Sequence, residues 1–234
     1  MDLALTVIPQ CRGVSLASSI VNPDAPADLD TVRASYDAVA DSYLAMVGDP
    51  GPWLRSALDA FAEQVREIGP VLDAGCGPGW ISDYLHRRGV DVSGVDLSPR
   101  MIEHARRQYP AVSFEVASVT DLKPEPGSLG GVLGWWSWFN LPRAWMPRVI
   151  ATMTRALRPD GQIVIGAHRG DGDQPRTRCY GDVPVEWTTH LYQPEELTVL
   201  LTAAGLEVVV DIRLAEQPPS QRPQLVVVGR KPSQ

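Results

Sequence analysis

The stretch VLDAGCGPGW, residues 71–80, decides the fold of this chain. A short apolar strand runs into a loop with Gly75, Gly77 and Gly79, and a helix is expected to follow. Glycines permit unusual backbone angles and leave room for a close ligand, and a helix N-terminus offers unpaired N–H groups. The spacing is GxGxG, one residue tighter than the dinucleotide fingerprint GxGxxG, and Asp73 stands two residues before the first glycine. The loop therefore predicts a ligand site, but not a pyrophosphate-binding loop.

A second acid supports a ligand site. Asp96 follows Gly75 by 21 residues and stands at the end of the next predicted strand, residues 90–95. An acid at this place in such folds accepts hydrogen bonds from a ribose diol. The alternative is a carboxylate that only caps the following helix.

Around this loop, apolar strands alternate with amphipathic helices. Strands are predicted at 71–73, 90–95, 112–116, 129–136, 162–167, 206–214 and 224–228, and helices at 31–46, 53–68, 80–88, from 99, at 142–157 and from 194. Alternating units of this kind predict a doubly wound α/β fold, with a mostly parallel seven-stranded sheet and helices on both faces. The last two strands are expected to form an antiparallel hairpin.

The chain divides into two parts in this interpretation. Residues 1–30 are an N-terminal extension that we expect to be loosely ordered, and residues 31–234 form the ligand-binding domain. Residues 31–47 are expected to form the first helix of this domain. The polar stretch 169–192 has no clear period, so we interpret it as an irregular insertion over the site.

Composition excludes several classes. The 234 residues contain 21 Lys and Arg against 28 Asp and Glu, a formal net charge of −7. Nucleic-acid binding depends largely on basic side chains that neutralise phosphates, so neither a nucleic acid nor an anionic membrane is an expected partner. The 3 cysteines include no CxxC pair, which disfavours a zinc site and a disulfide framework. A cytoplasmic protein is expected, and the oligomeric state is not readable.

Four motifs together resemble the class I S-adenosylmethionine (SAM)-dependent methyltransferases of the small-molecule type. LDAGCGPG is similar to the first motif of that family and GVDLSPRMIEHAR to the second. EVASVTDL is similar to the third, and LRPDGQIVIG to the region through the fifth strand. The resemblance extends over about residues 31–230 and implies SAM as cofactor and S-adenosylhomocysteine (SAH) as product.

The resemblance also implies a cofactor site. The glycines would line the methionine and ribose, Asp73 would bind the amino group and Asp96 the ribose. Hydrophobic residues and Ser118, where many members have Asp, would frame the adenine. Two tyrosines of the first helix would close over the methionine end, unless they only pack a helix face. The implied residues are Tyr36, Tyr43, Asp73, Gly75, Gly77, Gly79, Asp96, Leu97, Met101, Ser118, Val119 and Trp135.

The run GWWSWFNLP, residues 134–142, follows the fourth predicted strand. Aromatic faces attract a sulfonium cation and stack on planar acceptors, although some of these rings are expected only to pack under the sheet. Many family members have His where this chain has Asn140, and an asparagine takes no proton at neutral pH. The expected acceptor contacts are Trp136, Trp138, Phe139, Asn140, Trp187 and Tyr192.

His168 and His190 are the candidates for a general base, because an unperturbed imidazole titrates near neutral pH. His168 follows the fifth strand and His190 follows the polar insertion. The alternative for each is an ordinary hydrogen-bonded histidine. No cluster of metal ligands is visible in the sequence, so a metal-independent reaction is expected.

We therefore predict an enzyme that transfers a methyl group from SAM to a small molecule, such as a natural product, by direct displacement. The alternative is a SAM-binding protein that no longer methylates and acts as a rearrangement catalyst or a partner subunit. An NAD-linked oxidoreductase is disfavoured by the GxGxG spacing. A nucleic-acid methyltransferase is disfavoured by the charge and by the lack of an NPPY-type motif after the fourth strand.

Overall fold

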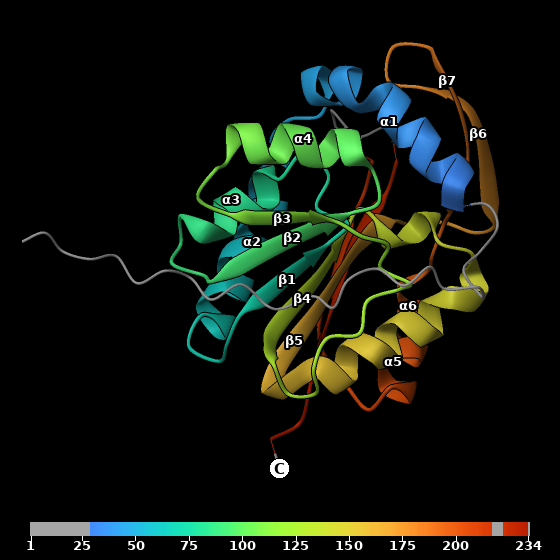
Figure 1. Cartoon of the computed structure of the whole chain (residues 1–234). Helices are drawn as coiled ribbons and strands as arrows, with labels where there is room; N and C mark the ends of the chain where they lie inside the picture. The colour runs from blue at the N-terminus through green and yellow to red at the C-terminus, as the bar shows by residue number, and fades with distance from the viewer. Residues whose placement is uncertain (1–28, 217–221, 234) are drawn as a thin grey trace, which may run out of the picture.

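The computed structural model describes residues 29–216 and 222–233. Its centre is a seven-stranded sheet with the order β3-β2-β1-β4-β5-β9-β8 (Figure 1). Only β9 is antiparallel to its neighbours, β5 and β8, so the predicted mostly parallel sheet with a C-terminal hairpin is confirmed. The strands are β1 (Val71–Ala74), β2 (Val92–Asp96), β3 (Ser113–Val116), β4 (Leu129–Trp135), β5 (Leu157–His168), β8 (Glu207–Leu214) and β9 (Gln224–Arg230).

Helices cover both faces of the sheet. Side chains of α2, α3 and α4 share one hydrophobic core with the sheet, and those of α5 and α6 share the other. All residues of β4 are buried, because a central parallel strand has helices on both sides. The helices are α1 (Leu29–Met46), α2 (Pro52–Val65), α3 (Trp80–His86), α4 (Pro99–Gln108), α5 (Met146–Ala156) and α6 (Pro194–Ala203).

The start of α4 shows how local sequence positions the ligand-facing end of β2. Ser98 is the N-cap, and its hydroxyl accepts a hydrogen bond from the Met101 backbone N–H at 3.1 Å. Pro99 occupies the first helical position, where a missing N–H costs nothing. The chain therefore turns sharply after Asp96 and keeps this carboxylate at the edge of the sheet.

Two expectations need correction. The stretch 169–192 is not irregular, because it contains the antiparallel hairpin of β6 (Asp173–Cys179) and β7 (Val183–His190). Most residues of β6 are exposed, so the strand has no apolar alternation by which the sequence could reveal it. The helix expected at 142–157 begins only at Met146, after the 3-10 turns Trp138–Asn140 and Arg143–Trp145. Of the N-terminal extension 1–30, residues 1–28 lie outside the described residues.

Helix α1 and the β6–β7 hairpin lie side by side beyond the carboxyl ends of the strands (Figure 1). Ser35 of α1 bonds to the β7 backbone at Glu186 in both directions: its hydroxyl donates to the carbonyl at 3.3 Å and accepts from the N–H at 2.9 Å. These bonds tie the two segments into one cover.

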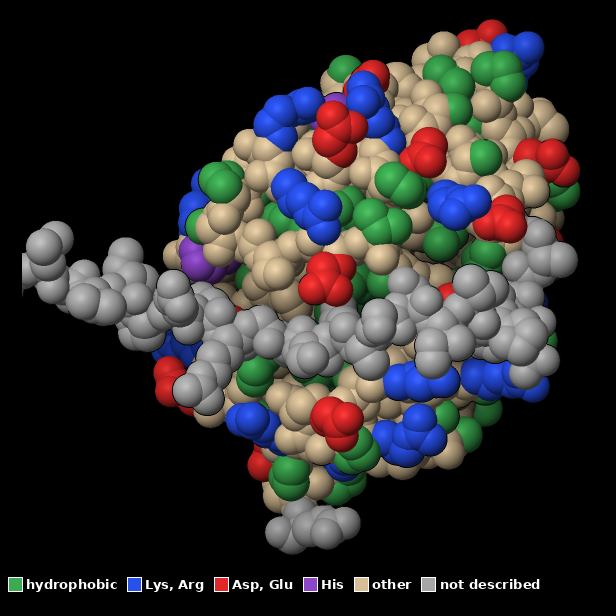
Figure 2. Space-filling view, viewed as in Figure 1, with side chains coloured by type: hydrophobic (Ala, Val, Ile, Leu, Met, Phe, Trp, Pro, Cys, Tyr) green, Lys and Arg blue, Asp and Glu red, His purple; other side chains and the backbone are tan. Residues whose placement is uncertain are grey.

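Figure 2 shows acidic and basic side chains interspersed over the face that it draws. No helix within residues 29–216 and 222–233 is long and apolar enough to span a bilayer.

Two glycines make a matched test of packing. A Cβ on Gly134 of β4 would lie 2.4 Å from the Trp138 ring, whereas one on Gly48 would meet nothing within 4 Å. Overpacking a core typically costs about 1–3 kcal/mol. We therefore expect Gly134→Ala to lower the free energy of unfolding by that amount in urea denaturation, and Gly48→Ala to leave it nearly unchanged. Equal stabilities would show that the indole does not need this space.

Candidate active site

A cavity of about 590 Å³ opens beyond the carboxyl ends of β1, β2, β4 and β5. Strand order reverses between β1 and β4, and ligands of open α/β sheets bind at such a switch point. Asp73, Asp96, Trp135 and His168, which end or lie near the ends of these four strands, all line the cavity.

The three glycines of the loop after β1 have different roles. A Cβ on Gly75 would lie 2.3 Å from the Ser137 Cβ, and one on Gly79 would lie 2.7 Å from the Phe114 ring. At Gly77 a Cβ would meet nothing within 4 Å, and this residue lines the cavity. All three have positive φ, which favours glycine. Gly75 and Gly79 therefore allow close packing of the protein itself, and Gly77 borders open space.

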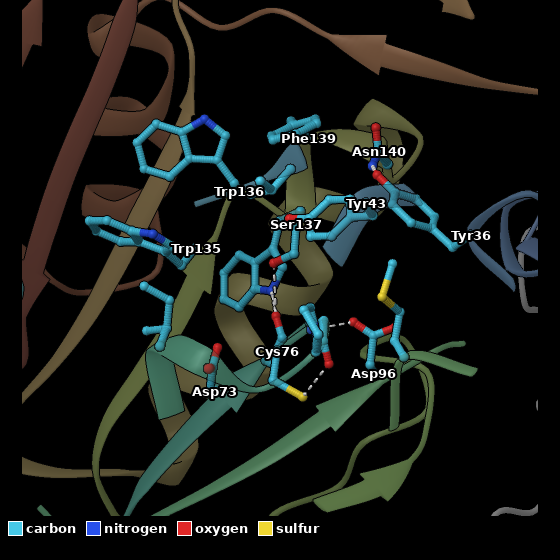
Figure 3. Close-up of a pocket in the computed structure, with 18 of the residues that line it drawn as sticks. Tyr36, Tyr43, Asp73, Cys76, Asp96, Trp135, Trp136, Ser137, Phe139 and Asn140 are labelled. Atoms are coloured by element: carbon cyan, nitrogen blue, oxygen red, sulfur yellow. Dashed lines mark hydrogen bonds between the residues drawn. The ribbon is translucent and has the colours of Figure 1, made fainter. Parts of the chain in front are cut away.

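Asp73 is a buried carboxyl at the floor of the cavity (Figure 3). Its Oδ2 accepts a hydrogen bond from the Ser82 hydroxyl at 2.7 Å, while its Oδ1 is buried without a partner. Burial, with a smaller contribution from Asp96, raises the pKa of Asp73 to about 7. A buried acceptor without a donor is costly, so this oxygen fits a ligand that brings a donor, above all a cation.

Asp96 organises the loop on the other side of the site. Its Oδ2 accepts from the Gly77 backbone N–H at 2.8 Å and its Oδ1 from the Ser98 N–H at 2.9 Å. The side chain therefore stabilises the turn before α4, whose N-cap is Ser98. It also lines the cavity, and a carboxylate with one bond on each oxygen still has lone pairs for a diol. Burial raises its pKa.

In the aromatic run after β4, some rings pack in the core and others border the cavity. Trp138 is 1% exposed, its indole N–H donates to the Ala74 carbonyl at 2.9 Å, and the absent side chain of Gly134 makes room for it. Trp136 has φ 52°, a left-handed conformation that is uncommon for a bulky residue. Its ring packs over Gly166 and meets the Trp135 ring edge-on, with centroids 4.9 Å apart.

The cover contributes a second set of rings. Tyr36 of α1 stacks on Trp187 of β7, with centroids 4.8 Å apart and planes 12° from parallel. The Asn140 amide donates to the Tyr36 hydroxyl at 2.5 Å, and the Asn140 Oδ1 is buried without a partner (Figure 3). Tyr43 contacts Tyr180 edge-on. Burial raises the pKa of Tyr36 well above its usual value, so its hydroxyl stays neutral.

The two candidate histidines differ in position. His168 lines the cavity, contacts the Phe139 ring, and has a buried Nδ1 without a partner. Burial, then the charges of Arg222 and Arg176, lower the pKa of His168 to about 4. His190 does not line the cavity, and its Nδ1 lies 2.7 Å from an Asp173 carboxylate oxygen.

Most residues expected at the site do line this cavity, but three do not. Gly79 packs against Phe114, His190 pairs with Asp173, and Tyr192 is buried in the core beside α5 and α6. The cavity brings together Tyr36, Tyr43, Asp73, Gly75, Gly77, Asp96, Leu97, Met101, Ser118, Val119, Trp135, Trp136, Trp138, Phe139, Asn140, His168 and Trp187.

The cavity also contains residues that the sequence analysis did not select. Ser137 lies inside the aromatic run and could have been included with it. Arg176, Tyr180 and Thr189 come from the hairpin, and their direction depends on strand pairing that the sequence did not reveal. Residues 46–54, where the first predicted helix ends and the second begins, line the cavity as well.

Comparison with known proteins identifies a methyltransferase domain in this chain. Residues 71–161 match a family model described as a methyltransferase domain. A malonyl-[acyl-carrier protein] O-methyltransferase of Enterobacter lignolyticus is 31% identical over 143 residues, 59% of this chain and 53% of that protein. Residues 71–161 therefore form a methyltransferase domain, and the chain has the fold of the class I SAM-dependent methyltransferases. It spans about half the length of this curated relative.

Solved structures share the methyltransferase fold. A 1,6-didemethyltoxoflavin-N1-methyltransferase of Burkholderia thailandensis, with its substrate and SAH bound, has a TM-score of 0.63 at 23% identity, covering 93% of this chain and 95% of its own. The [4+2]-cyclase SpnF has a TM-score of 0.65 at 17% identity, covering 90% of this chain and 98% of its own. SAM, the cofactor expected from the motifs, is the cofactor of the methyltransferases that share this domain and fold.

The raised pKa of Asp73 can be tested in the protein without ligand, through the pH dependence of its stability. The folded state keeps a proton on Asp73 up to about pH 7, whereas the unfolded carboxyl loses it near pH 4. Relative to Asp73→Asn, the wild-type free energy of unfolding should therefore fall by roughly 1 kcal/mol per unit as pH rises from 5 to 7, then level off. Urea denaturation at each pH measures this difference, and parallel profiles would contradict the raised pKa.

Proposed function

We propose that this protein transfers a methyl group from SAM to a small-molecule acceptor by direct displacement. One observation carries the proposal. Two acids, buried Asp73 with an unpartnered oxygen and half-buried Asp96, flank a glycine loop that opens into a cavity lined by aromatic rings. That arrangement fits a cofactor with an ammonium group, a ribose diol and a sulfonium.

Different residues of the cavity would contact different groups of SAM. Asp73 Oδ1 would accept from the amino group, and the remaining lone pairs of Asp96 would accept from the ribose hydroxyls. Gly77 leaves the approach to the loop open. Leu97, Met101, Ser118 and Val119 would surround the adenine, as expected from the family motifs.

Bound SAM supplies an electrophilic methyl group, so the main task of the protein is alignment. Positioning of reactants contributes roughly 7–11 kcal/mol in favourable cases. The stacked pair Tyr36 and Trp187 closes the cavity on the side of the cover, and Trp135 and Trp136 border it beside β4. Neutral His168 and the free Oδ1 of Asn140 can orient an acceptor or take its hydrogen bond.

A second function has specific support. A SAM-binding catalyst of rearrangement would need aromatic walls and no general base, and Asn140 occupies the place where many family members have His. The structurally similar SpnF is described as a [4+2]-cyclase. The two functions differ in whether SAM is consumed: a methyltransferase converts it into SAH, whereas a rearrangement catalyst leaves it unchanged.

A cytoplasmic location and a lack of nucleic-acid or membrane partners stay predictions. They rest on the formal charge of −7 and on 3 scattered cysteines.

Calorimetric titration with SAM, SAH and NAD in parallel tests the cofactor. Micromolar binding of the two adenosyl ligands, with no binding of NAD, is the expected result. A screen of small acceptors for SAH release then tests methyl transfer. Binding of NAD alone would overturn the proposal, and SAM binding without turnover on any acceptor would favour the second function.

The role of Asp96 in binding the ribose can be tested against a control acid, Asp91, on the same part of the chain. We expect Asp96→Ala to weaken SAH binding at least tenfold, because the ribose would lose its acceptor. Exposed Asp91, just before the strand, makes a control, and Asp91→Ala should bind SAH as the wild type does. Since Asp96 also bonds Gly77 and Ser98, Asp96→Asn serves as a variant that keeps the side-chain shape. Wild-type affinity in folded Asp96→Ala would exclude the ribose role.

Substitutions of His168 and His190 should have different effects on the rate of turnover. General acid–base groups contribute about 10²–10⁴-fold, and only His168 borders the cavity. With an acceptor found in the screen, His168→Gln should lower turnover at least tenfold and His190→Gln less than twofold. A larger loss in His190→Gln would place the base at the open end of the hairpin, beside Asp173.

A further inference from the structure

Arg176 is the one lysine or arginine, within residues 29–216 and 222–233, that lines the cavity. It lies on β6, opposite Trp187 of β7 in the pairing of the hairpin, and its side chain is partly buried. A guanidinium inside an aromatic cavity loses hydration, so it favours an anionic partner more than one on the surface does.

The partners that the protein itself gives Arg176 are neutral. Its Nε donates to the Thr189 hydroxyl at 3.4 Å, and its second terminal nitrogen donates to the Gln174 amide oxygen at 3.0 Å. Two other arginines of this region have acidic partners: Arg178 pairs with Asp182 at 3.1 Å, and Arg143 with Asp173 at 3.0 Å. Within the described residues Arg176 forms no ion pair, so neutral hydrogen bonds orient it and leave its charge uncompensated.

The surroundings of Arg176 are cationic as well. Arg222 donates to the same Gln174 amide oxygen. The charges of both arginines disfavour protonation of His168, whose pKa they lower. An anion placed among these side chains would be attracted by both guanidinium groups.

This end of the cavity lies away from the proposed cofactor. Asp73 and Asp96 belong to β1 and β2, and Ser118 follows β3. His168 ends β5, on the other side of β4, and Gln224 pairs with it from β9. Gln224 and Thr189 also line the cavity. The cationic end therefore belongs to the acceptor side of the site.

We propose that the acceptor carries a carboxylate, which Arg176 binds as an anchor while the apolar body of the acceptor packs against Trp136, Phe139 and Trp187. This inference rests on the proposed function, since it assigns the substrate class of the same site. The anchored carboxylate is distinct from the atom that is methylated, because it would lie on the β5 side, away from the loop after β1. An arginine is suited to this role because its planar fork matches a carboxylate.

Matched probes test the proposal on the full chain loaded with SAH. The probes are aromatic monocarboxylates that increase in size from benzoate through cinnamate to 2-naphthoate, each paired with its neutral carboxamide. Binding is followed by quenching of tryptophan fluorescence and by calorimetry. We expect at least one acid to bind at least tenfold more tightly than its amide, and Arg176→Gln to remove this preference.

Two controls make the result specific. Arg178→Gln changes an exposed arginine on the same strand that pairs with Asp182, and it should keep the preference for the acid. Arg176→Lys should restore part of it, since the charge remains without the fork. Equal binding of acids and amides by the wild type, no binding of any acid to the SAH complex, or an equal loss in both Gln variants would overturn the carboxylate anchor.

Affinity for SAH separates failure of this inference from failure of the proposed function. Arg176→Gln should bind SAH as the wild type does, because the arginine lies on the acceptor side. If the wild type binds SAH and discriminates no acid, only the anchor is wrong. If the wild type does not bind SAH, the proposed function itself fails.

Discussion

The backbone carbonyl of Ala74, the last residue of β1, is the junction on which the site depends. It accepts hydrogen bonds from the Ser137 hydroxyl and from the Trp138 indole N–H, both at 2.9 Å. These bonds draw the segment after β4 against the loop after β1, so closely that Gly75 has no room for a side chain. The same contact therefore shapes the glycine loop on one side and places the aromatic rings on the other.

The cavity formed around this junction is electrically divided. Buried Asp73 and half-buried Asp96 lie toward β1 and β2, whereas the cationic Arg176 lies toward β5 and the hairpin, beside neutral His168. Acids at one end and a guanidinium at the other would complement a cationic cofactor beside the anionic acceptor that we propose. Such complementarity orients ligands and excludes wrong partners more than it adds affinity. The central sheet supplies the acids, and the added hairpin supplies the arginine.

The seven-stranded framework by itself does not decide which reaction occurs. The same fold is found in a methyltransferase with bound SAH and in a [4+2]-cyclase, as is usual for common folds. In this chain the site is covered by α1 and the β6–β7 hairpin, which are joined by Ser35 and by the stacked rings of Tyr36 and Trp187. We therefore expect the acceptor to be selected where this cover meets the sheet.

The sequence by itself determined the sheet, the loop after β1, and the places of Asp73 and Asp96, because these follow from local patterns: an apolar strand, a glycine spacing, and an acid at a strand end. Only the tertiary structure decided that Trp138 is packing, that Tyr192 and His190 lie outside the cavity, and that Arg176 lies within it. Those outcomes depend on which strands pair and which face each residue takes. Strand β6 is polar and mostly exposed, so it has no apolar period from which its pairing with β7 could be predicted.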